Sequence, residues 1–218
     1  MTGVFTVYLV DDDPGVLKSL SRLLRTKGYD VRPYSSPQAF LEEHDEAIPG
    51  CAILDVSMPD LDGLEIQDVL TTAGGSHRPV VFVTGKGDIP TSVRAMKAGA
   101  IDFLTKPVKD RDLFEALSRA EALDAELRRL QSELDVVRTK VRTLTPRERE
   151  VLTHVVAGRL NKQIAGELGT VEKTIKVHRS RMMEKLGIRT VADLVRMAEK
   201  LNLSGNTHLL AQGPTRRA

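Results

Sequence analysis

The sequence predicts an α/β domain, built on a five-stranded doubly wound parallel sheet, that a long helical linker joins to an all-α domain of four helices. Three observations lead to this fold class. Short apolar runs rich in β-branched residues alternate with helical stretches in the first half of the chain. A heptad repeat without glycine or proline follows. Four short helical stretches, three of which end at a glycine, come last.

Charge also divides the chain into two parts. The 218 residues include 32 Lys and Arg and 30 Asp and Glu. Residues 1–118 hold 12 basic and 18 acidic side chains, whereas residues 144–203 hold 12 basic and 7 acidic ones. This asymmetry indicates two domains with different partners, the second partner being a polyanion. The single cysteine and the lack of an 18-residue apolar run predict a cytoplasmic protein with no membrane partner.

The first domain is expected to alternate strands and helices. Pro14, Pro37 and Pro90 each stand near a helix start, where the missing N–H costs nothing. In a parallel sheet of this kind, ligands bind in the crevice at the carboxyl ends of the strands. The expected strands are 4–10, 30–34, 51–54, 80–83 and 101–104, and the expected helices are 14–26, 37–43, 63–70 and 90–98.

Polar side chains directly follow four of these strands, and the fold brings them to one edge of the sheet. Several carboxylates in one crevice repel one another, so they need a cation, and Mg²⁺ suits oxygen ligands and phosphate. An aspartate can itself accept a phosphoryl group, and a lysine can pair with it. Each residue alone could be a helix cap or a surface amine, but their joint placement favours phosphoryl chemistry. They are Asp11, Asp12, Asp13, Asp55, Thr84 and Lys106.

The middle segment, 113–144, is one helical pattern in which the first and fourth positions of every heptad are apolar. In a parallel pair of such helices, charged positions beside the seam pair opposite charges, as Arg119 with Asp124. One helix packed on its own domain is the alternative, but it explains the stripe only to about Leu117. We therefore expect a homodimer whose seam is formed by Leu123, Leu127, Leu130, Leu134, Val137 and Val141.

The last ordered segment opens with a helix start signal. Thr145 is a natural N-cap, Pro146 fits the first helical position, and Glu148 completes a capping box. After that point, Gly158, Gly169 and Gly187 are expected to end the first three helices. The expected helices are 146–157, 162–168, 172–186 and 191–201.

The third of these helices carries five Lys and Arg side chains. Cations on one helix suit the phosphates and base edges of a DNA major groove. A solvated basic face is the alternative, but a short helix and a tight turn at Gly169 precede this helix, which favours a helix-turn-helix. We expect double-stranded DNA as the partner.

Several motifs stand at the ends of the predicted strands of the first domain. They are Val10-Asp11-Asp12, Asp55, Met58-Pro59-Asp60-Leu61-Asp62-Gly63, Thr84-Gly85, the run Ala95-Met96-Lys97-Ala98-Gly99-Ala100-Ile101-Asp102-Phe103, and Lys106-Pro107. Through them, residues 4–118 resemble the receiver domain of two-component response regulators.

The resemblance implies a phosphorylation site. Asp55 is the expected phosphoacceptor, and Asp11 and Asp12 would hold Mg²⁺ together with Asp55 and the backbone carbonyl of Ser57. The role of the extra acid Asp13 is left open by the resemblance.

The resemblance also implies a switch. Thr84 would supply the switch hydroxyl, Phe103 the switch aromatic ring, and Lys106 the amine that pairs with the phosphoryl group. The bond between Lys106 and Pro107 is expected to be cis.

Motifs in the last domain lead to a second resemblance. They are the run Leu144-Thr145-Pro146-Arg147-Glu148-Arg149-Glu150-Val151-Leu152, Gly158, Asn161-Lys162-Gln163-Ile164-Ala165, Leu168-Gly169 and Thr174-Ile175-Lys176-Val177-His178. Residues 144–201 thereby resemble the LuxR/FixJ-type helix-turn-helix, which implies base contacts near Lys176, Val177 and Ser180. The full set of expected DNA-binding residues is Lys173, Thr174, Lys176, Val177, Arg179, Ser180 and Arg181.

The resulting prediction is a response regulator, not an enzyme. A sensor histidine kinase would phosphorylate Asp55, and phosphorylation would promote homodimerisation and sequence-specific DNA binding that regulates transcription. The alternatives are a Mg²⁺-dependent phosphatase with an aspartate nucleophile, which would place a second acid where Ser57 stands, and a constitutive DNA-binding dimer with a receiver scaffold. The expected domains are a receiver at 1–118, a coiled-coil linker at 119–143, a helix-turn-helix domain at 144–203 and a disordered tail at 204–218.

Overall fold

The computed structural model describes residues 4–59, 61–72, 78–85 and 88–201. They belong to two compact units, Met1–Arg128 and Arg129–Ala218. The predicted tail and the motif residue Asp60 lie outside the described residues. Within the described part of the chain, no helix combines the length and the apolar character needed to cross a membrane.

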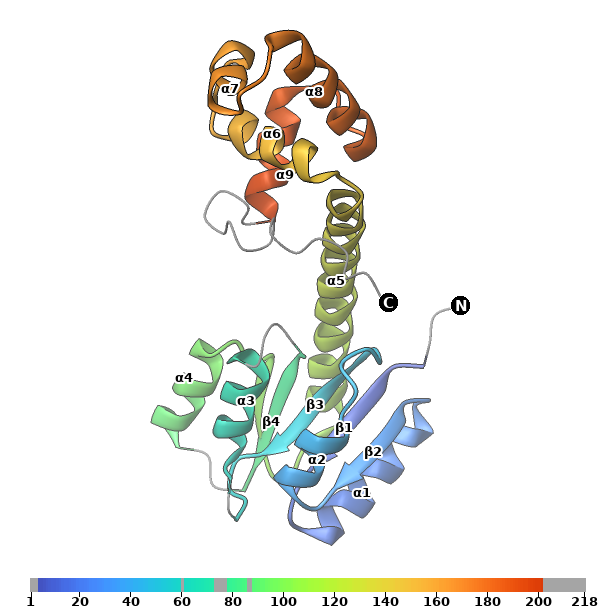
Figure 1. The fold of residues 1–218 in the computed structure, drawn as a ribbon. Helices are drawn as coiled ribbons and strands as arrows, with labels where there is room; N and C mark the ends of the chain where they lie inside the picture. Colours follow the sequence, from blue (N-terminus) through green and yellow to red (C-terminus); the bar gives the residue numbers. More distant parts are fainter. Residues whose placement is uncertain (1–3, 60, 73–77, 86–87, 202–218) are drawn as a thin grey trace, which may run out of the picture. The chain divides into compact units, whose positions relative to one another are not determined.

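The first unit contains the predicted five-stranded parallel sheet (Figure 1). The strand order is β2-β1-β3-β4-β5, with β1 and β3 side by side near the centre. Strand β1 has no exposed face, because Tyr8 and Val10 enter one apolar cluster while Val7 and Leu9 enter another. The strands are β1 (Thr6–Val10), β2 (Asp30–Tyr34), β3 (Gly50–Asp55), β4 (Val80–Thr84) and β5 (Asp102–Thr105).

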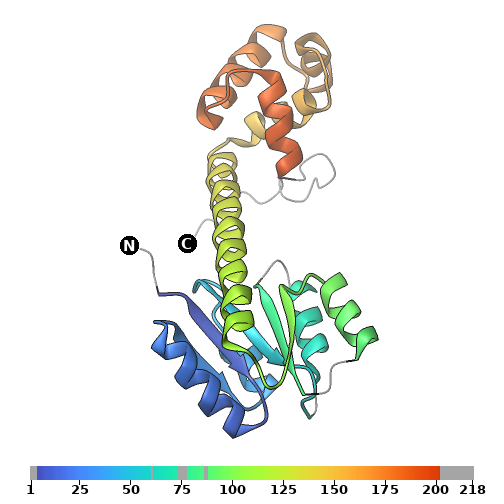
Figure 2. The same ribbon diagram turned by 180° about the vertical axis from the view of Figure 1, so that it is seen from behind.

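Helices cover both faces of this sheet, which confirms the doubly wound prediction. Helices α2, α3 and α4 lie on one face of the sheet, and α1 and α5 lie on the other (Figures 1 and 2). Side chains of the first group belong to one apolar cluster, and side chains of the second group belong to the other. The helices are α1 (Pro14–Thr26), α2 (Pro37–Glu43), α3 (Gly63–Thr72), α4 (Ile89–Lys97) and α5 (Asp110–Arg142).

Local signals explain where helices of the first unit begin. The side chain of Asp13 accepts hydrogen bonds from the backbone N–H groups of Gly15 (2.7 Å) and Val16 (3.4 Å), so it is the N-cap of α1. This gives the extra acid a structural role. Ser36 and Asp88 cap α2 and α4 in the same way.

Helix α5 is much longer than the part of it that packs on the sheet. Leu113, Ala116, Leu117 and Ala120 are fully buried in the apolar cluster of the first unit. The helix then continues without a break to Arg142, as the heptad pattern predicts. The turns of α5 after Ala120 are therefore stabilised by contacts outside the apolar core of the sheet.

The second unit holds the four predicted helices. Gly158, Gly169 and Gly187 follow the first three of them with φ values of 77°, 61° and 70°, a backbone region that favours glycine. Their core contains Val151, Ile164 and other apolar side chains of all four helices. The helices are α6 (Pro146–Val156), α7 (Asn161–Glu167), α8 (Glu172–Leu186) and α9 (Val191–Lys200).

The predicted capping box at the start of α6 is present. The Thr145 side chain accepts from the Glu148 N–H (3.3 Å), and Glu148 Oε2 accepts from the Thr145 N–H (2.8 Å). The same buried carboxylate accepts a hydrogen bond from Lys185 Nζ at 2.7 Å, which ties α6 to α8. Burial raises the pKa of Glu148, but the hydrogen bonds from Lys185 and Thr145 outweigh it, so the pKa lies below its ordinary value of 4.5.

This ion pair predicts a pH-dependent stability. Glu148→Gln keeps an acceptor for Thr145 but loses the charge pair with Lys185, so we expect a loss of about 1 kcal/mol of unfolding free energy at neutral pH. Because the folded pKa is depressed, the stabilisation is present above 4.5 and is lost as pH falls through the lower folded value. Urea unfolding followed by circular dichroism should show that the free energies of unfolding of the wild type and of Glu148→Gln become equal as the pH falls through this range. Equal stability at neutral pH would refute the expectation.

Candidate functional site

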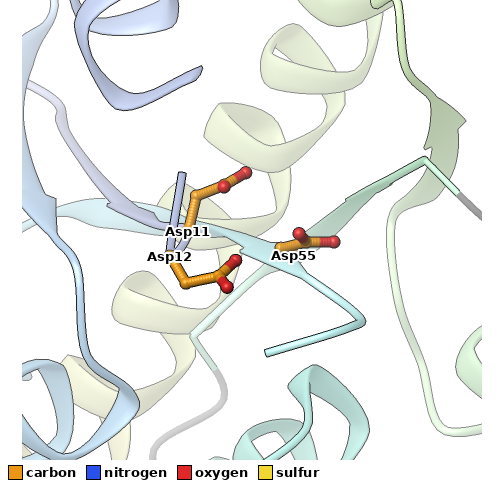
Figure 3. A group of neighbouring side chains, drawn as sticks. All are labelled: Asp11, Asp12 and Asp55. Carbon is orange, nitrogen blue, oxygen red and sulfur yellow. The ribbon is translucent and has the colours of Figure 1, made fainter. Parts of the chain in front are cut away.

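Three carboxylates meet at the carboxyl edge of the sheet. Asp11 and Asp12 follow β1, and Asp55 ends β3 (Figure 3). The pairing of β1 with β3 brings the ends of these two strands together. Each side chain offers an oxygen that lies within 4.8 Å of the others. The sequence prediction that these three acids share one site is consistent with this geometry.

The site is buried on one side and open on the other. Asp11 is 1% exposed and Asp55 is 6% exposed, whereas Asp12 is exposed to solvent. Lys106 Nζ donates hydrogen bonds to Asp11 Oδ2 at 2.6 Å and to Asp55 Oδ2 at 2.9 Å. One ammonium group thus bridges the two buried carboxylates, and the third carboxylate, that of Asp12, is open to solvent.

Electrostatics favour a bound cation here. The pKa of Asp11 lies above its ordinary value, because burial disfavours the charged form more than the hydrogen bond from Lys106 favours it. Burial lowers the pKa of Lys106, but its hydrogen bonds to Asp11 and Asp55 outweigh burial and raise it. Lys106 is therefore cationic at neutral pH. The three carboxylates and the one ammonium together leave a formal negative charge of two, which a divalent cation would balance. Oxygen ligands of this kind suit Mg²⁺.

Ser57 lies beside Asp55, the expected phosphoacceptor. It is exposed, and its backbone N–H donates to Asp55 Oδ1 at 3.3 Å. The backbone of residue 57 is therefore adjacent to the three acids. Its carbonyl as a metal ligand stays a prediction.

The predicted switch residues lie on the two neighbouring strands. Thr84 ends β4 and is fully buried, and its carbonyl accepts a hydrogen bond from the Lys106 N–H at 2.8 Å. Phe103 on β5 is partly buried and packs 6.0 Å from the Phe82 ring, measured between centroids. The bond between Lys106 and Pro107 is cis, as the resemblance implies. Strand pairing thus brings Thr84 and Lys106 to the same edge as the acids.

Gly63 shapes the backbone next to the site. A Cβ at this position would overlap the carbonyl oxygen of Asp55 and lie 3.0 Å from the Phe82 ring. The Gly63 N–H also donates to the Val56 carbonyl at 3.2 Å. The start of α3 therefore packs directly on the end of β3, which only glycine permits.

The predicted DNA-binding residues share helix α8. Ile175, Met182 and Leu186 are buried and anchor this helix in the second unit. Its exposed surface carries Lys173, Lys176, Val177, Ser180 and Arg181, while Thr174 and Arg179 are half-buried.

Two residues outside the predicted set lie next to this surface. Arg179 donates to Asn161 Oδ1 at 3.0 Å, which links α8 to the first residue of α7. Arg189 joins Lys176 and Ser180 around a hollow of about 320 Å³. The predicted set of DNA-binding residues leaves out Asn161 and Arg189 because it was drawn from the third helix alone; Asn161 appeared only within the motif of the second helix. Arg189 is the one basic residue of the four-residue loop between α8 and α9.

The predicted seam residues do not share one environment. Leu123 and Leu130 are 37% and 43% exposed, whereas Leu134 and Val137 pack against the core of the second unit. Val141 is buried in that core, and Leu127 is half-buried. The alternative of packing within the chain therefore explains the last part of the stripe. The first part remains available to a second copy.

The charge pairing proposed across the seam is not the pairing that the structure contains. Arg119 pairs with Asp102 of β5, and Asp124 is buried and pairs with Arg128 one turn further along α5. Both charges are used within the receiver unit. The heptad argument was wrong about Asp124, which it treated as solvent-exposed although this side chain is buried; Arg119 is exposed, but it is paired with Asp102.

Comparison with known proteins agrees with this geometry. The family model described as "Response regulator receiver domain" matches residues 7–118, and the model described as "Bacterial regulatory proteins, luxR family" matches residues 142–198. The response regulator protein TmoT of Ectopseudomonas mendocina is 43% identical over 195 residues, which cover 89% of this chain and 88% of the relative. The transcriptional regulatory protein FixJ of Rhizobium meliloti is 38% identical over 200 residues, covering 89% and 95%.

A solved structure of full length is also similar. The response regulator StyR is 43% identical and superposes with a TM-score of 0.72, covering 91% of this chain and all of that one (100%). The likeness spans both units and not the receiver alone. The chain therefore belongs to the family of transcriptional response regulators that join a receiver domain to a DNA-binding domain of the LuxR type.

Proposed function

We propose that Asp55 accepts a phosphoryl group from a sensor histidine kinase and that this modification controls DNA binding by α8. The observation that carries the proposal is the bridge from Lys106 Nζ to Asp55 and Asp11, with Asp12 open beside it. A carboxylate oxygen of Asp55 attacks the phosphorus of the phosphohistidine. The P–N bond breaks, its electron pair stays with the imidazole, and an acyl phosphate forms.

Side chains around Asp55 stabilise this transfer. Asp11, Asp12, Asp55 and the Ser57 carbonyl would hold Mg²⁺, which when bound neutralises charge on the phosphoryl oxygens. Lys106 is already hydrogen-bonded to Asp55 and supplies a second positive charge at the transferred group. Because position 57 holds serine instead of the second acid of an aspartate-based phosphatase, we propose that the chain is a regulator and not an enzyme.

The new charge is expected to move the switch residues. A phosphoryl group adds a charge of about −1.5 to −2, and in our proposal the Thr84 hydroxyl then donates to one of its oxygens. Phe103, which is partly buried against Phe82, moves further inward in response. The change reaches the surface formed by α4, β5 and α5.

Helix α4 presents an apolar surface that supports receiver pairing. Ile89, Val93 and Met96 are 79%, 44% and 46% exposed and lie on one face of the helix, since they are four and three positions apart. Exposed apolar side chains that cluster in this way favour a protein partner. We propose that two phosphorylated receivers pair through this face, and that the linker seam extends the homodimer.

Pairing would place two DNA-binding domains on two half-sites of double-stranded DNA. Residues 1–118 act as the receiver, 119–143 as the linker and 144–203 as the DNA-binding domain in this proposal. A regulator of this kind works where the chromosome lies, so we propose a cytoplasmic location.

The function is tested by DNA binding of the full chain with and without acetyl phosphate and Mg²⁺. We expect phosphorylation to raise the affinity for a two-site promoter fragment, found by footprinting on genomic DNA. Addition of a chelator should abolish the rise, because the acid cluster would lose its cation. An affinity that is unchanged by the phosphodonor, in a chain shown by mass to be phosphorylated, would contradict the proposal.

Lys176 provides a test of the DNA-facing surface. Its side chain is 63% exposed and forms an ion pair with Glu172 on the same helix, with Lys176 Nζ 3.0 Å from Glu172 Oε1. If it reads a base edge, Lys176→Ala should weaken specific binding by about 1–3 kcal/mol and relax the base preference at one position. If it contacts phosphate, affinity should fall on all sequences and the salt dependence should become shallower. Lys200→Ala on α9 is the matched control, and unchanged binding by Lys176→Ala would exclude this part of α8 as the DNA-reading surface.

A further inference from the structure

Arg128 fastens helix α5 to the loop that precedes strand β3, at the end of the sheet opposite to the acid cluster. Its guanidinium donates to three consecutive backbone carbonyls in the loop between α2 and β3, those of Glu46 (3.0 Å), Ala47 (2.9 Å) and Ile48 (2.6 Å). Its Nε also donates to Asp124 Oδ2 at 2.8 Å. A planar guanidinium suits several acceptors arranged around it, which a lysine ammonium does not match.

Asp124 completes this contact from the same helix. It is 6% exposed, although it belongs to a stretch of α5 that lies beyond the last buried apolar residue of the receiver, Ala120. A buried carboxylate is costly unless it is paired, and Arg128 pairs with it. Asp124 therefore holds the Arg128 guanidinium in place over the loop. We call Asp124, Arg128 and the carbonyls of residues 46–48 the linker clamp.

A second arginine holds the same loop from the sheet side. Arg78 Nη2 donates to the carbonyls of Asp45 (2.7 Å) and Ile48 (3.3 Å), and its guanidinium lies 4.4 Å from the centre of the Tyr8 ring. Burial lowers the pKa of Arg78, while the charge of Asp124 acts in the opposite direction. The Ile48 carbonyl is thus shared by two guanidinium groups, and the negative charge of Asp124 acts on both.

The clamped loop leads directly into the phosphoacceptor strand. Strand β3 begins at Gly50, where a Cβ would overlap the Thr6 carbonyl oxygen and lie 3.0 Å from Arg78 Nη1. The same strand ends at Asp55. One six-residue strand therefore connects the loop that holds the linker with the carboxylate that is expected to be phosphorylated.

We propose that the linker clamp makes α5 part of the receiver as far as Arg128 and that Arg128 is the positioning residue through which the receiver controls its DNA-binding domain. The second claim, that Arg128 transmits control to the DNA-binding domain, rests on the function proposed above. Without the clamp, the turns after Ala120 would lose their main polar anchor, and a helix of so few unsupported turns is only marginally stable. A loosened helix would pass on no defined change from the receiver.

Arg128→Ala in the full chain tests the clamp, with Arg129→Ala as the matched control. Arg129 lies one position further along, carries the same charge and pairs with Glu133 of α5, so both variants lose one arginine from the same helix. Amide hydrogen exchange should become about tenfold faster at residues 45–50 and 121–128 in Arg128→Ala alone. Arg128→Lys should resemble Arg128→Ala, because charge without the planar donor set does not span three carbonyls. Arg128→Lys therefore provides the same test if Arg128→Ala does not fold.

The regulatory role has its own readout. Phosphorylation of Asp55 by acetyl phosphate should proceed at the wild-type rate in Arg128→Ala, while the phosphorylation-dependent rise in two-site DNA affinity should fall about tenfold or more. Unchanged hydrogen exchange would overturn the clamp. Faster exchange with an intact affinity rise would overturn its regulatory role. If wild type and Arg129→Ala show no affinity rise, the proposed function fails instead, and the exchange experiment still decides whether the clamp exists.

Discussion

Acetyl phosphate with Mg²⁺ is expected to phosphorylate the wild-type chain and to leave Asp55→Asn unmodified. The amide of asparagine is close in shape to the carboxylate but is not a nucleophile toward phosphorus. The Lys106 ammonium, 2.9 Å from Asp55 in the wild type, could still donate to the amide oxygen, so the fold should survive. Intact-mass measurement would show the gain of one phosphoryl group in the wild type only.

Asp13→Asn is the matched control for this experiment. Asp13 lies next to the acid cluster, but its side chain caps α1, and asparagine is an equally good N-cap. The control should therefore be phosphorylated normally, whereas Asp55→Asn should also lose the whole phosphorylation-dependent rise in DNA affinity. Equal modification of the two variants would place the phosphoacceptor elsewhere.

Replacing Leu123 and Leu130 by aspartate is expected to abolish linker-mediated dimerisation. Both side chains are substantially exposed in the single chain, at 37% and 43%, and they are seven positions apart, on the same heptad position. Burial against a second copy is worth about 1.5–3 kcal/mol for each leucine. The double variant would replace this gain with like charges facing each other across the seam.

These two positions are better test sites than Leu134. Leu134 packs against the core of the second unit, so an aspartate there would disturb the DNA-binding domain as well as the dimer. Val136 provides the control, because it is 54% exposed on the same helix but stands off the heptad stripe. Val136→Asp should leave dimerisation intact.

Sedimentation of the phosphorylated full-length variants would decide the question. We expect Leu123→Asp/Leu130→Asp to sediment as a monomer or a weakened dimer and to lose tight binding to a two-site promoter, while contact with a single half-site persists. Retention of both dimer mass and two-site affinity would show that the stripe is a packing face and that the linker is a passive tether.

Local signals in the sequence determined most of the secondary structure. The bounds predicted for α1 and α2 and for strand β2 match the structure, because a proline or an N-cap acts within one turn of the chain. The capping box at Thr145 and the glycines after α6, α7 and α8 were predictable for the same reason. The shared edge for Asp11, Asp55 and Lys106 followed from a rule of parallel sheets, which needs only the order of the strands.

Only the tertiary structure decided which hydrogen-bond partners the charged side chains have. Asp13 reads as one more acid in a row of three, and only the path of the backbone into α1 makes it a cap. Asp124 and Arg128 read as solvated linker charges, yet Arg128 contacts a loop about 80 positions earlier in the chain, and Asp124 is buried and paired with Arg128. Sequence spacing contains no signal for such a contact.

The heptad stripe shows the physical limit most directly. Its periodicity correctly predicted one long helix, because apolar spacing reports which face of a helix is buried. Periodicity does not report what buries that face. Leu117 is buried in the receiver core and Val141 in the core of the second unit, whereas Leu123 and Leu130 stay substantially exposed. Only the packing of the folded chain therefore separates the residues that are already buried from those left for a second copy.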